Sequence, residues 1–234
     1  MLSYPIDLLR PTEMLWRRSQ VADSDRAING QAYARVTDGG GLWTCTMTVP
    51  LTNPDKVRTA LAFSELAEGG ATPFIVPVLN IGFQPYVGGV APADVPFSDD
   101  SSFSDGSLIG SNGIKIALAE NAALRATALV IRSDVAAALR GFEFFSFTHP
   151  TQGRRVYVVL AIQDRDDGKI DIQTRPPLRE AVAALGAGDP PAETELDFDN
   201  PSCVMRLTNA AAAVAAIKRP VKSTLTLNFE EYFE

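Results

Sequence analysis

Alternating hydrophobic and polar residues dominate long stretches of the chain. Residues 42–51, LWTCTMTVPL, alternate large hydrophobic side chains with threonines, which is the period of two expected of a half-buried strand. The same alternation is read in RRVYVVLAIQ at 154–163 and in VKSTLTLNFEEYFE at 221–234. We expect this last segment to be a strand tied into a sheet.

Further strands are predicted where apolar, aromatic or β-branched residues lie between turn signals. They are expected at 72–79, 114–120, 124–132, 141–148, 169–174, 193–198 and 203–208. HPTQG at 149–153 and DRDDG at 164–168 have the composition of turns. The segment 141–174 is therefore predicted to be a three-stranded meander.

Two short helices are predicted between the strands. Asn53 is a favourable N-cap and Pro54 a favoured first residue, and the helical pattern then runs until Gly69, which predicts a helix over about 54–68. PPLREAVAALG at 176–186 begins with proline and ends with glycine, which predicts a second helix over about 177–185. Many strands and two short helices indicate a mainly β fold, an antiparallel β-barrel or sandwich.

The domain organisation follows from the absence of a clear linker. Residues 1–234 are interpreted as a single β-rich domain. The segment 80–113 is dense in Gly, Pro, Ser and Asp and is interpreted as a long loop or insertion. A minor alternative extends it to 135 as an inserted subdomain.

Charge and composition narrow the classes of function. The chain of 234 residues carries a net charge of -7, and Arg17-Arg18 and Arg154-Arg155 are isolated pairs. Phosphate neutralisation needs clustered Lys and Arg, so we expect no sequence-specific nucleic-acid binding. No export signal is visible at the amino terminus, and the run AAAAVAAI at 210–217 is too short to cross a bilayer. We therefore expect a soluble protein without membrane insertion.

Residues that could carry catalysis are few. His149 is the only histidine and lies in the predicted HPTQG turn, and no serine stands in a G-x-S-x-G context. Cys45 and Cys203 are too far apart in sequence for a familiar zinc set, and we interpret them as buried free thiols, with a disulfide between them as the alternative. No glycine motif for nucleotide binding occurs. We predict that the chain is not an enzyme and has no cofactor.

Paired carboxylates and one acidic stretch are the remaining candidates for chemistry. Asp166-Asp167 falls in a predicted hairpin turn, and Glu230-Glu231 is expected at the exposed end of the last strand. The stretch FSDDSSFSDGS at 97–107, which includes Asp99-Asp100, could attract Ca²⁺, but its aspartates do not follow the EF-hand order. We interpret it as a connector anchored by Phe97 and Phe103, and we predict no metal site.

Several segments, taken in order, resemble tail proteins of long-tailed, siphovirus-type bacteriophages, in particular the distal tail and tail-hub components. The segments are LWRRSQ, the G-x-W strand at 41–43, the helix ending in ELAEGG, PFSDDSSFSDGS, GFEFFSFTHPTQGRRVYVV, RPPLREAV, FDNPSCVMRL and LTLNFEEYF. The resemblance implies a virion structural protein made in the host cytoplasm and located at the tail tip. It implies a β-barrel subunit that forms a closed ring with copies of itself, often a hexamer, joins the tail tube protein to the tail-hub proteins, and passes DNA.

Surfaces for ring contacts are expected at edge strands and long loops, because ring subunits make head-to-tail contacts. The first expected contact is the 80–113 loop, with Phe97, Phe103 and Asp105. The second is the segment around RPPLRE, with Arg175, Pro177 and Arg179.

The sequence leaves two other functions open. A carbohydrate- or receptor-binding β-sandwich module of a tail or adhesin would use exposed aromatic residues such as Trp16 or Tyr86. A hydrolase would combine His149 with an aspartate of the 97–107 stretch, and it is the less supported of the two.

Overall fold

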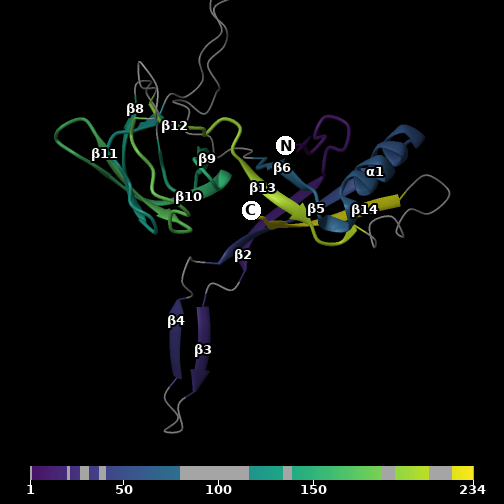
Figure 1. Cartoon of the computed structure of the whole chain (residues 1–234), viewed down its shortest axis with the longest axis horizontal. Helices are drawn as coiled ribbons and strands as arrows, with labels where there is room; N and C mark the ends of the chain where they lie inside the picture. The colour runs from purple at the N-terminus through teal and green to yellow at the C-terminus, as the bar shows by residue number, and fades with distance from the viewer. Residues whose placement is uncertain are drawn as a thin grey trace, which may run out of the picture.

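A computed structural model describes most of the chain. It covers residues 2–19, 22–26, 32–36, 41–79, 116–133, 139–185, 193–210 and 223–233, with 22–26 and 32–36 described by their backbone. The described chain is mainly β, which confirms the predicted fold class. Figure 1 shows two lobes side by side, one built on a nearly closed sheet and one on an open sheet covered by a helix.

The open-sheet lobe contains a six-stranded sheet with the order β1-β6-β13-β14-β5-β2. The strands are β1 (Leu2–Ser3), β6 (Pro73–Pro77), β13 (Ser202–Leu207), β14 (Ser223–Glu231), β5 (Leu42–Leu51) and β2 (Glu13–Ser19). Only the short β1 pairs in parallel, with β6. The last strand, β14, lies between β13 and β5, so the prediction that it is tied into a sheet is confirmed.

One helix covers the open sheet. Helix α1 (Pro54–Leu66) begins where predicted, because the Asn53 side chain accepts the Lys56 N–H at 2.8 Å. Phe63 packs into the core beneath it, and a short 3₁₀ turn, η1 (Glu68–Gly70), follows. The predicted helix over about 54–68 is therefore confirmed. Within the part of the chain that is described, no helix has the length and apolar character to cross a membrane.

The barrel lobe contains the second six-stranded sheet, with the order β12-β7-β8-β11-β10-β9. The strands are β12 (Glu195–Leu196), β7 (Ile116–Leu118), β8 (Ala128–Ser133), β11 (Ile170–Arg175), β10 (Gly153–Asp164) and β9 (Phe144–His149). Ser146 of β9 and Asp197 exchange both backbone hydrogen bonds, at 2.9 and 2.8 Å, which nearly closes the sheet. Strands β9, β10 and β11 form the meander predicted for 141–174.

A separate hairpin projects from the two lobes. Strands β3 (Ala22–Arg26) and β4 (Ala32–Val36) pair antiparallel with each other, and they lie in sequence between β2 and β5. Figure 1 shows this hairpin extending away from both lobes.

The second predicted helix, over about 177–185, is wrong. The Leu178 N–H donates to Ala126 O at 2.9 Å, and the Val182 N–H donates to Ala122 O at 2.8 Å, so these donors serve the neighbouring segment instead of a helix. The two apolar side chains are four residues apart, a spacing that fits one side of an extended chain as well as one side of a helix. Both are buried in the barrel core.

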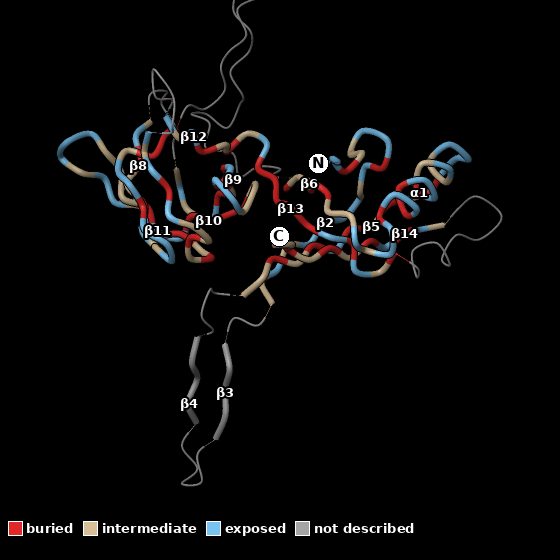
Figure 2. The backbone as a smooth tube through the Cα atoms, viewed as in Figure 1, coloured by how far each residue is buried: buried red, intermediate tan, exposed pale blue. Residues whose placement is uncertain are grey.

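Two hydrophobic cores share strand β10. Val156 and Val158 belong to the core of the open-sheet lobe, whereas Tyr157 and Val159 belong to the barrel core. The simple alternation expected for 154–163 is therefore replaced by burial on both faces, and Leu160 is 46% exposed. Figure 2 shows buried segments running through both lobes. The interpretation of residues 1–234 as one domain stays a prediction.

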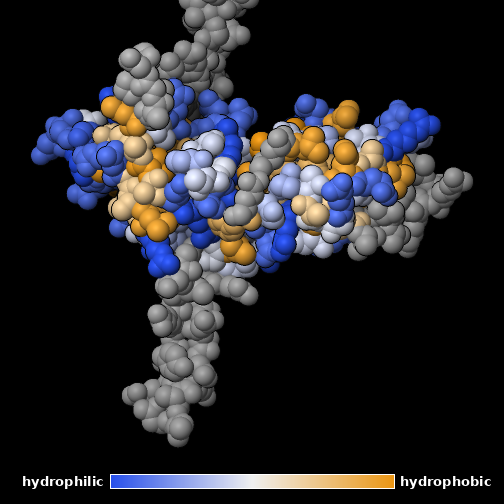
Figure 3. Space-filling model, in the orientation of Figure 1, coloured by the Kyte–Doolittle hydropathy of each residue, from blue (hydrophilic) through white to orange (hydrophobic). Residues whose placement is uncertain are grey.

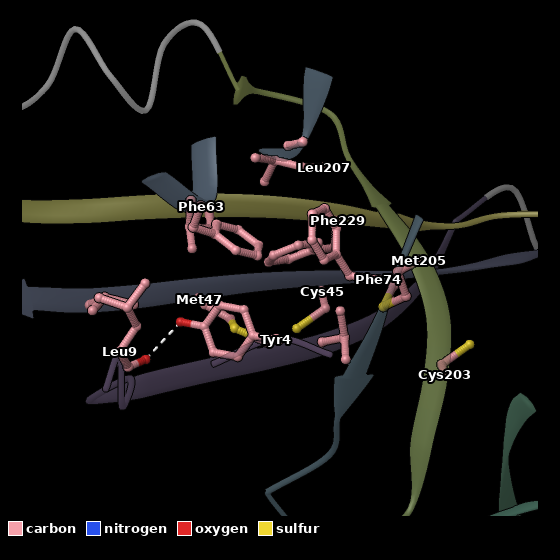
Figure 4. Close-up of a cluster of buried hydrophobic side chains, with 14 of the residues drawn as sticks. Tyr4, Leu9, Cys45, Met47, Phe63, Phe74, Cys203, Met205, Leu207 and Phe229 are labelled. Carbon is pink, nitrogen blue, oxygen red and sulfur yellow. Dashed lines mark hydrogen bonds between the residues drawn. The ribbon is translucent and has the colours of Figure 1, made fainter. Parts of the chain in front are cut away.

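The open-sheet core is rich in aromatic residues (Figure 4). The ring of Phe63 lies 5.4 Å from Tyr4 and 4.7 Å from Phe74, and the Tyr4 hydroxyl donates to Leu9 O at 2.7 Å. Cys45 and Cys203 are free and buried in the same core, as predicted. They lie on β5 and β13, which are separated by β14, and burial raises the pKa of both thiols.

Gly70 is predicted to be the less replaceable of two neighbouring glycines. Its φ is +103°, and a Cβ atom there would lie 2.3 Å from Leu207 O of β13. Gly70→Ala should lower the free energy of unfolding by about 2 kcal/mol or more, because both the backbone angle and the contact are unfavourable. Urea denaturation followed by circular dichroism would measure the change.

Gly69→Ala is the matched control for this prediction. Gly69 has a φ of +69°, but a Cβ atom added there would have no neighbouring atom within 4 Å. The variant should lose only about 1 kcal/mol, the usual cost of the left-handed conformation. Equal losses for the two variants would contradict the close approach of η1 to β13.

Candidate functional site

A buried ionic cluster lies where the two lobes meet. Its centre is Glu231, whose side chain is 1% exposed at the end of β14. One carboxylate oxygen, Oε2, accepts the Trp43 N–H at 3.1 Å and the Arg179 guanidinium at 2.9 Å. The other oxygen, Oε1, lies 3.9 Å from Arg155 Nη1. Glu231 therefore joins β5, β10, β14 and the segment after β11.

Both arginines of this cluster have further contacts. Arg155 is 1% exposed, donates to Val204 O at 3.3 Å, and stacks 4.3 Å from the centre of the Phe233 ring. Arg179 donates to Gly41 O, and its guanidinium lies 5.3 Å from the same ring. Cation–π contacts of this kind are strongest where water is excluded. Breaking a buried pair of this sort is costly because a charge is left without compensation.

Trp43 connects the ionic cluster to strand β10. Its indole N–H donates to Val156 O at 2.8 Å, and its ring packs on Phe144 at 5.7 Å and on Trp16 at 6.0 Å. An indole buried among aromatic rings usually has a hydrogen-bond acceptor, and here the acceptor is the backbone of the strand that both lobes share.

His149 lies beside this cluster. It is the last residue of β9 and 2% exposed, so the predicted turn is present but the histidine is buried beside it. Its Nε2 is 2.7 Å from the Tyr157 hydroxyl, which also accepts the Arg179 N–H at 3.2 Å. Burial lowers the pKa of His149 to about 4; Glu180 opposes this change, and Arg155 and Arg179 add to it. His149 is therefore neutral at pH 7.

Their buried surroundings keep both His149 and Tyr157 in the neutral form at pH 7. Burial raises the pKa of the Tyr157 hydroxyl, which keeps it protonated, and the imidazole has little contact with solvent. Neither cysteine thiol has a lowered pKa that would make it nucleophilic. The hydrogen bonds and ion pairs of this cluster hold neighbouring strands and loops together. The prediction that the chain is not an enzyme stays a prediction.

The segment after β11 is anchored to the β9–β10 turn as well as to Glu231. Glu180 Oε2 accepts the backbone N–H of Thr151 at 3.0 Å and of Gln152 at 3.3 Å, and these bonds lower the pKa of its carboxyl. Leu178 is buried in the barrel core. Three consecutive residues, 178–180, thus fix this segment between the lobes.

The residues predicted to form contacts are placed unevenly. Arg175 ends β11 and Pro177 lies two residues later, both half-buried, while the Arg179 side chain is 9% exposed and paired with Glu231. The structure thus brings Arg179 into the ionic cluster. Phe97, Phe103 and Asp105, like the whole 80–113 loop and the 97–107 stretch considered for Ca²⁺, lie outside the described residues. Among the residues that are described, no group of three or more His, Cys, Asp or Glu is arranged to hold a metal ion.

The expectation that Glu230-Glu231 is exposed is half wrong. Glu230 forms a surface pair with Arg206 at 3.2 Å, but Glu231 is buried. The alternation of buried residues Leu225, Leu227 and Phe229 continues to Glu231, so the strand pattern contained the signal. Asp166 and Asp167 are exposed in the β10–β11 turn, as predicted.

Comparisons with known proteins add no assignment: no family model matches the chain, and no curated protein matches its sequence.

Glu231→Gln should destabilise the protein strongly. The substitution removes the negative charge between Arg155 and Arg179, and the expected loss is about 3 kcal/mol or more in the free energy of unfolding. Glu230→Gln, which breaks a pair exposed to solvent, is the control and should lose less than about 0.5 kcal/mol. Similar losses in the two variants would show that the Glu231 charge does not stabilise the fold as predicted. Guanidinium denaturation at pH 7 measures both.

Acid should weaken the protein through His149. Its pKa is lowered from 6.5 to about 4 on folding, so its contribution is complete above pH 6.5 and is lost as the pH falls toward 4. The loss at pH 4 is roughly 3 kcal/mol relative to pH 7. His149→Gln should lack this loss of unfolding free energy. Carboxylates titrate in both proteins, so the difference between their unfolding free energies from pH 7 to pH 4 reports His149 alone. Parallel pH curves for the two proteins would refute the assignment.

Proposed function

We propose that this protein is a structural subunit that assembles with copies of itself into a ring at the distal end of a phage tail. The ring would join the tail tube to the tail-tip hub and let DNA pass. The resemblance implies six copies. Two observations support this proposal: several sequence segments, taken in order, resemble phage tail proteins, and the mainly β fold agrees with that resemblance. Its location in the virion is part of the same proposal.

The observation that carries the proposal is the open edge of one sheet. Among the described strands, the seven-residue β2 pairs only with β5, whereas the barrel sheet is nearly closed on itself. An edge of this length presents backbone donors and acceptors that another chain can pair with. Head-to-tail contacts that use such edges close into rings when the rotation between subunits permits.

The ionic cluster at the lobe junction supports a mechanical role. Glu231, Arg155 and Arg179 are held among four segments from distant parts of the sequence, which fixes one lobe against the other. In a ring subunit, such a junction would keep the two lobes in one relative position while load passes between tail components. The net charge of -7 is compatible with the passage of DNA, because an anionic wall repels phosphates.

The carbohydrate-binding alternative gains no specific support. Trp16 is half-buried, it packs edge-on against Trp43, and its indole nitrogen is buried. A ring in that position offers little surface for stacking on a sugar. Tyr86 lies outside the described residues.

Light scattering of the purified chain tests the proposal. We expect a particle whose mass is several times 25.1 kDa, with ring-shaped images in negative stain. A strictly monomeric protein without affinity for tail-tube or hub proteins would contradict it. Glycan-array binding that is lost in Trp16→Ala would support the alternative instead.

A further inference from the structure

Three arginines from different segments gather near the lobe junction. Arg179 donates to Gly41 O, and the next residue, Leu42, pairs with Ser19 of β2, which places the neighbouring Arg18 beside Arg179. Arg175, four residues before Arg179, ends β11. Burial lowers the pKa of Arg18, and the charges of Arg175 and Arg179 lower it further, which agrees with this proximity.

The positive charge of Arg175 is not paired with a carboxylate among the described residues. Its guanidinium donates to the adjacent Thr174 O at 3.0 Å, and no carboxylate of the described residues contacts it. The carboxylate of Glu231 is already engaged by Arg179 and Trp43. A carboxylate from outside the chain could bind the Arg175 guanidinium through two parallel hydrogen bonds.

The opposite end of the β10–β11 hairpin is acidic. Arg165 is paired with Glu120 and Asp171, and Lys169 with Glu120 and Asp167. The side chains of Asp164 and Asp166 are exposed and form no ion pair or hydrogen bond with other described residues. Figure 3 shows a strongly hydrophilic surface at the outer end of the barrel lobe, on the left of the view.

The two charged ends are far enough apart to serve different neighbours. Arg175 pairs with Val158 at one end of the β10–β11 hairpin, and Ile170 pairs with Asp164 at the other. Five residue steps along β11 correspond to about 17 Å. One copy can therefore offer its basic end to one neighbour and its acidic turn to another.

We propose that Arg175, with Arg18 and Arg179 beside it, binds the acidic β10–β11 turn of a second copy of this chain through Asp164 and Asp166. The proposal rests on the proposed ring, in which each head-to-tail contact joins one patch of a copy to a different patch of its neighbour. Charge pairs of this kind fix the register of a contact and exclude wrong partners. The partner is thus identified by its chemistry, a carboxylate-bearing turn of an identical chain.

Charge reversal on each side of the contact tests this pairing. Arg175→Glu alone and Asp164→Arg/Asp166→Arg alone should each weaken assembly by about tenfold or more, because like charges then meet. An equimolar mixture of the two variants should assemble, since every contact in an alternating ring again joins opposite charges. One chain that carries all three substitutions should assemble as well. Sedimentation velocity measures assembly in each case.

Matched controls and a folding check complete the design. Arg58→Glu changes the charge by the same amount as Arg175→Glu, and Asp55→Arg/Glu65→Arg by the same amount as Asp164→Arg/Asp166→Arg; these exposed positions of α1 lie away from the contact, and both controls should leave assembly unchanged. Circular dichroism melting confirms that each variant folds. If Arg175→Glu fails to fold, Arg175→Gln replaces it and should give a smaller loss of assembly.

The outcomes separate this inference from the proposed function. A monomeric unmodified protein contradicts the ring itself. Assembly that survives both reversals, or that neither the mixture nor the triple variant restores, overturns the pairing and leaves the ring standing. If Arg175→Glu keeps assembly but abolishes salt-sensitive binding of a short DNA duplex, the arginines serve phosphates and the pairing is also overturned.

Discussion

Burial of strand β10 on both faces is the constraint on which the rest of the fold depends. Its valines at 156 and 158 complete the core of the open-sheet lobe, and Tyr157 and Val159 complete the core of the barrel. Neither core is finished without it, and a shift of one residue in its register would exchange the two sets. The Trp43 bond to the backbone of Val156 holds this register from the side of the open sheet.

The ionic cluster belongs to the same junction. A buried guanidinium such as Arg155 is favourable only when it is paired, so the two lobes have to meet in one relative position to bring Glu231 beside it. Hydrophobic contact alone would tolerate several positions. The polar groups therefore add specificity, at the cost of removing three charges from water.

Much of the fold was predictable because strand alternation is a local property of the sequence. The strands at 42–51, 141–174 and the end of the chain needed only neighbouring residues. The helix predicted for 177–185 is wrong because an apolar spacing of four residues suits both a helix and an extended chain, and hydrogen bonds to the distant backbone of 122–126 decide between them. The alternation of β14 places Glu231 on the same buried face as Phe229, two residues before it. The sequence pattern therefore contained the signal, but a glutamate is usually expected at the surface. The convergence of Arg155 and Arg179 on it depends on how the lobes pack, which no local pattern contains.

The position of β14 in the open sheet also affects the order in which the chain can fold. All strands of the barrel lie between residues 116 and 196, so that lobe can form from one continuous stretch. Strand β5, at 42–51, has β14, at 223–231, as one neighbour, and contacts between such distant segments form slowly. A ribosome has to deliver more than 170 further residues before β5 gains this neighbour. Until then one edge of β5 is open to pairing with other chains. The folded barrel presents Val156 and Val158 of β10, against which the open sheet can then pack.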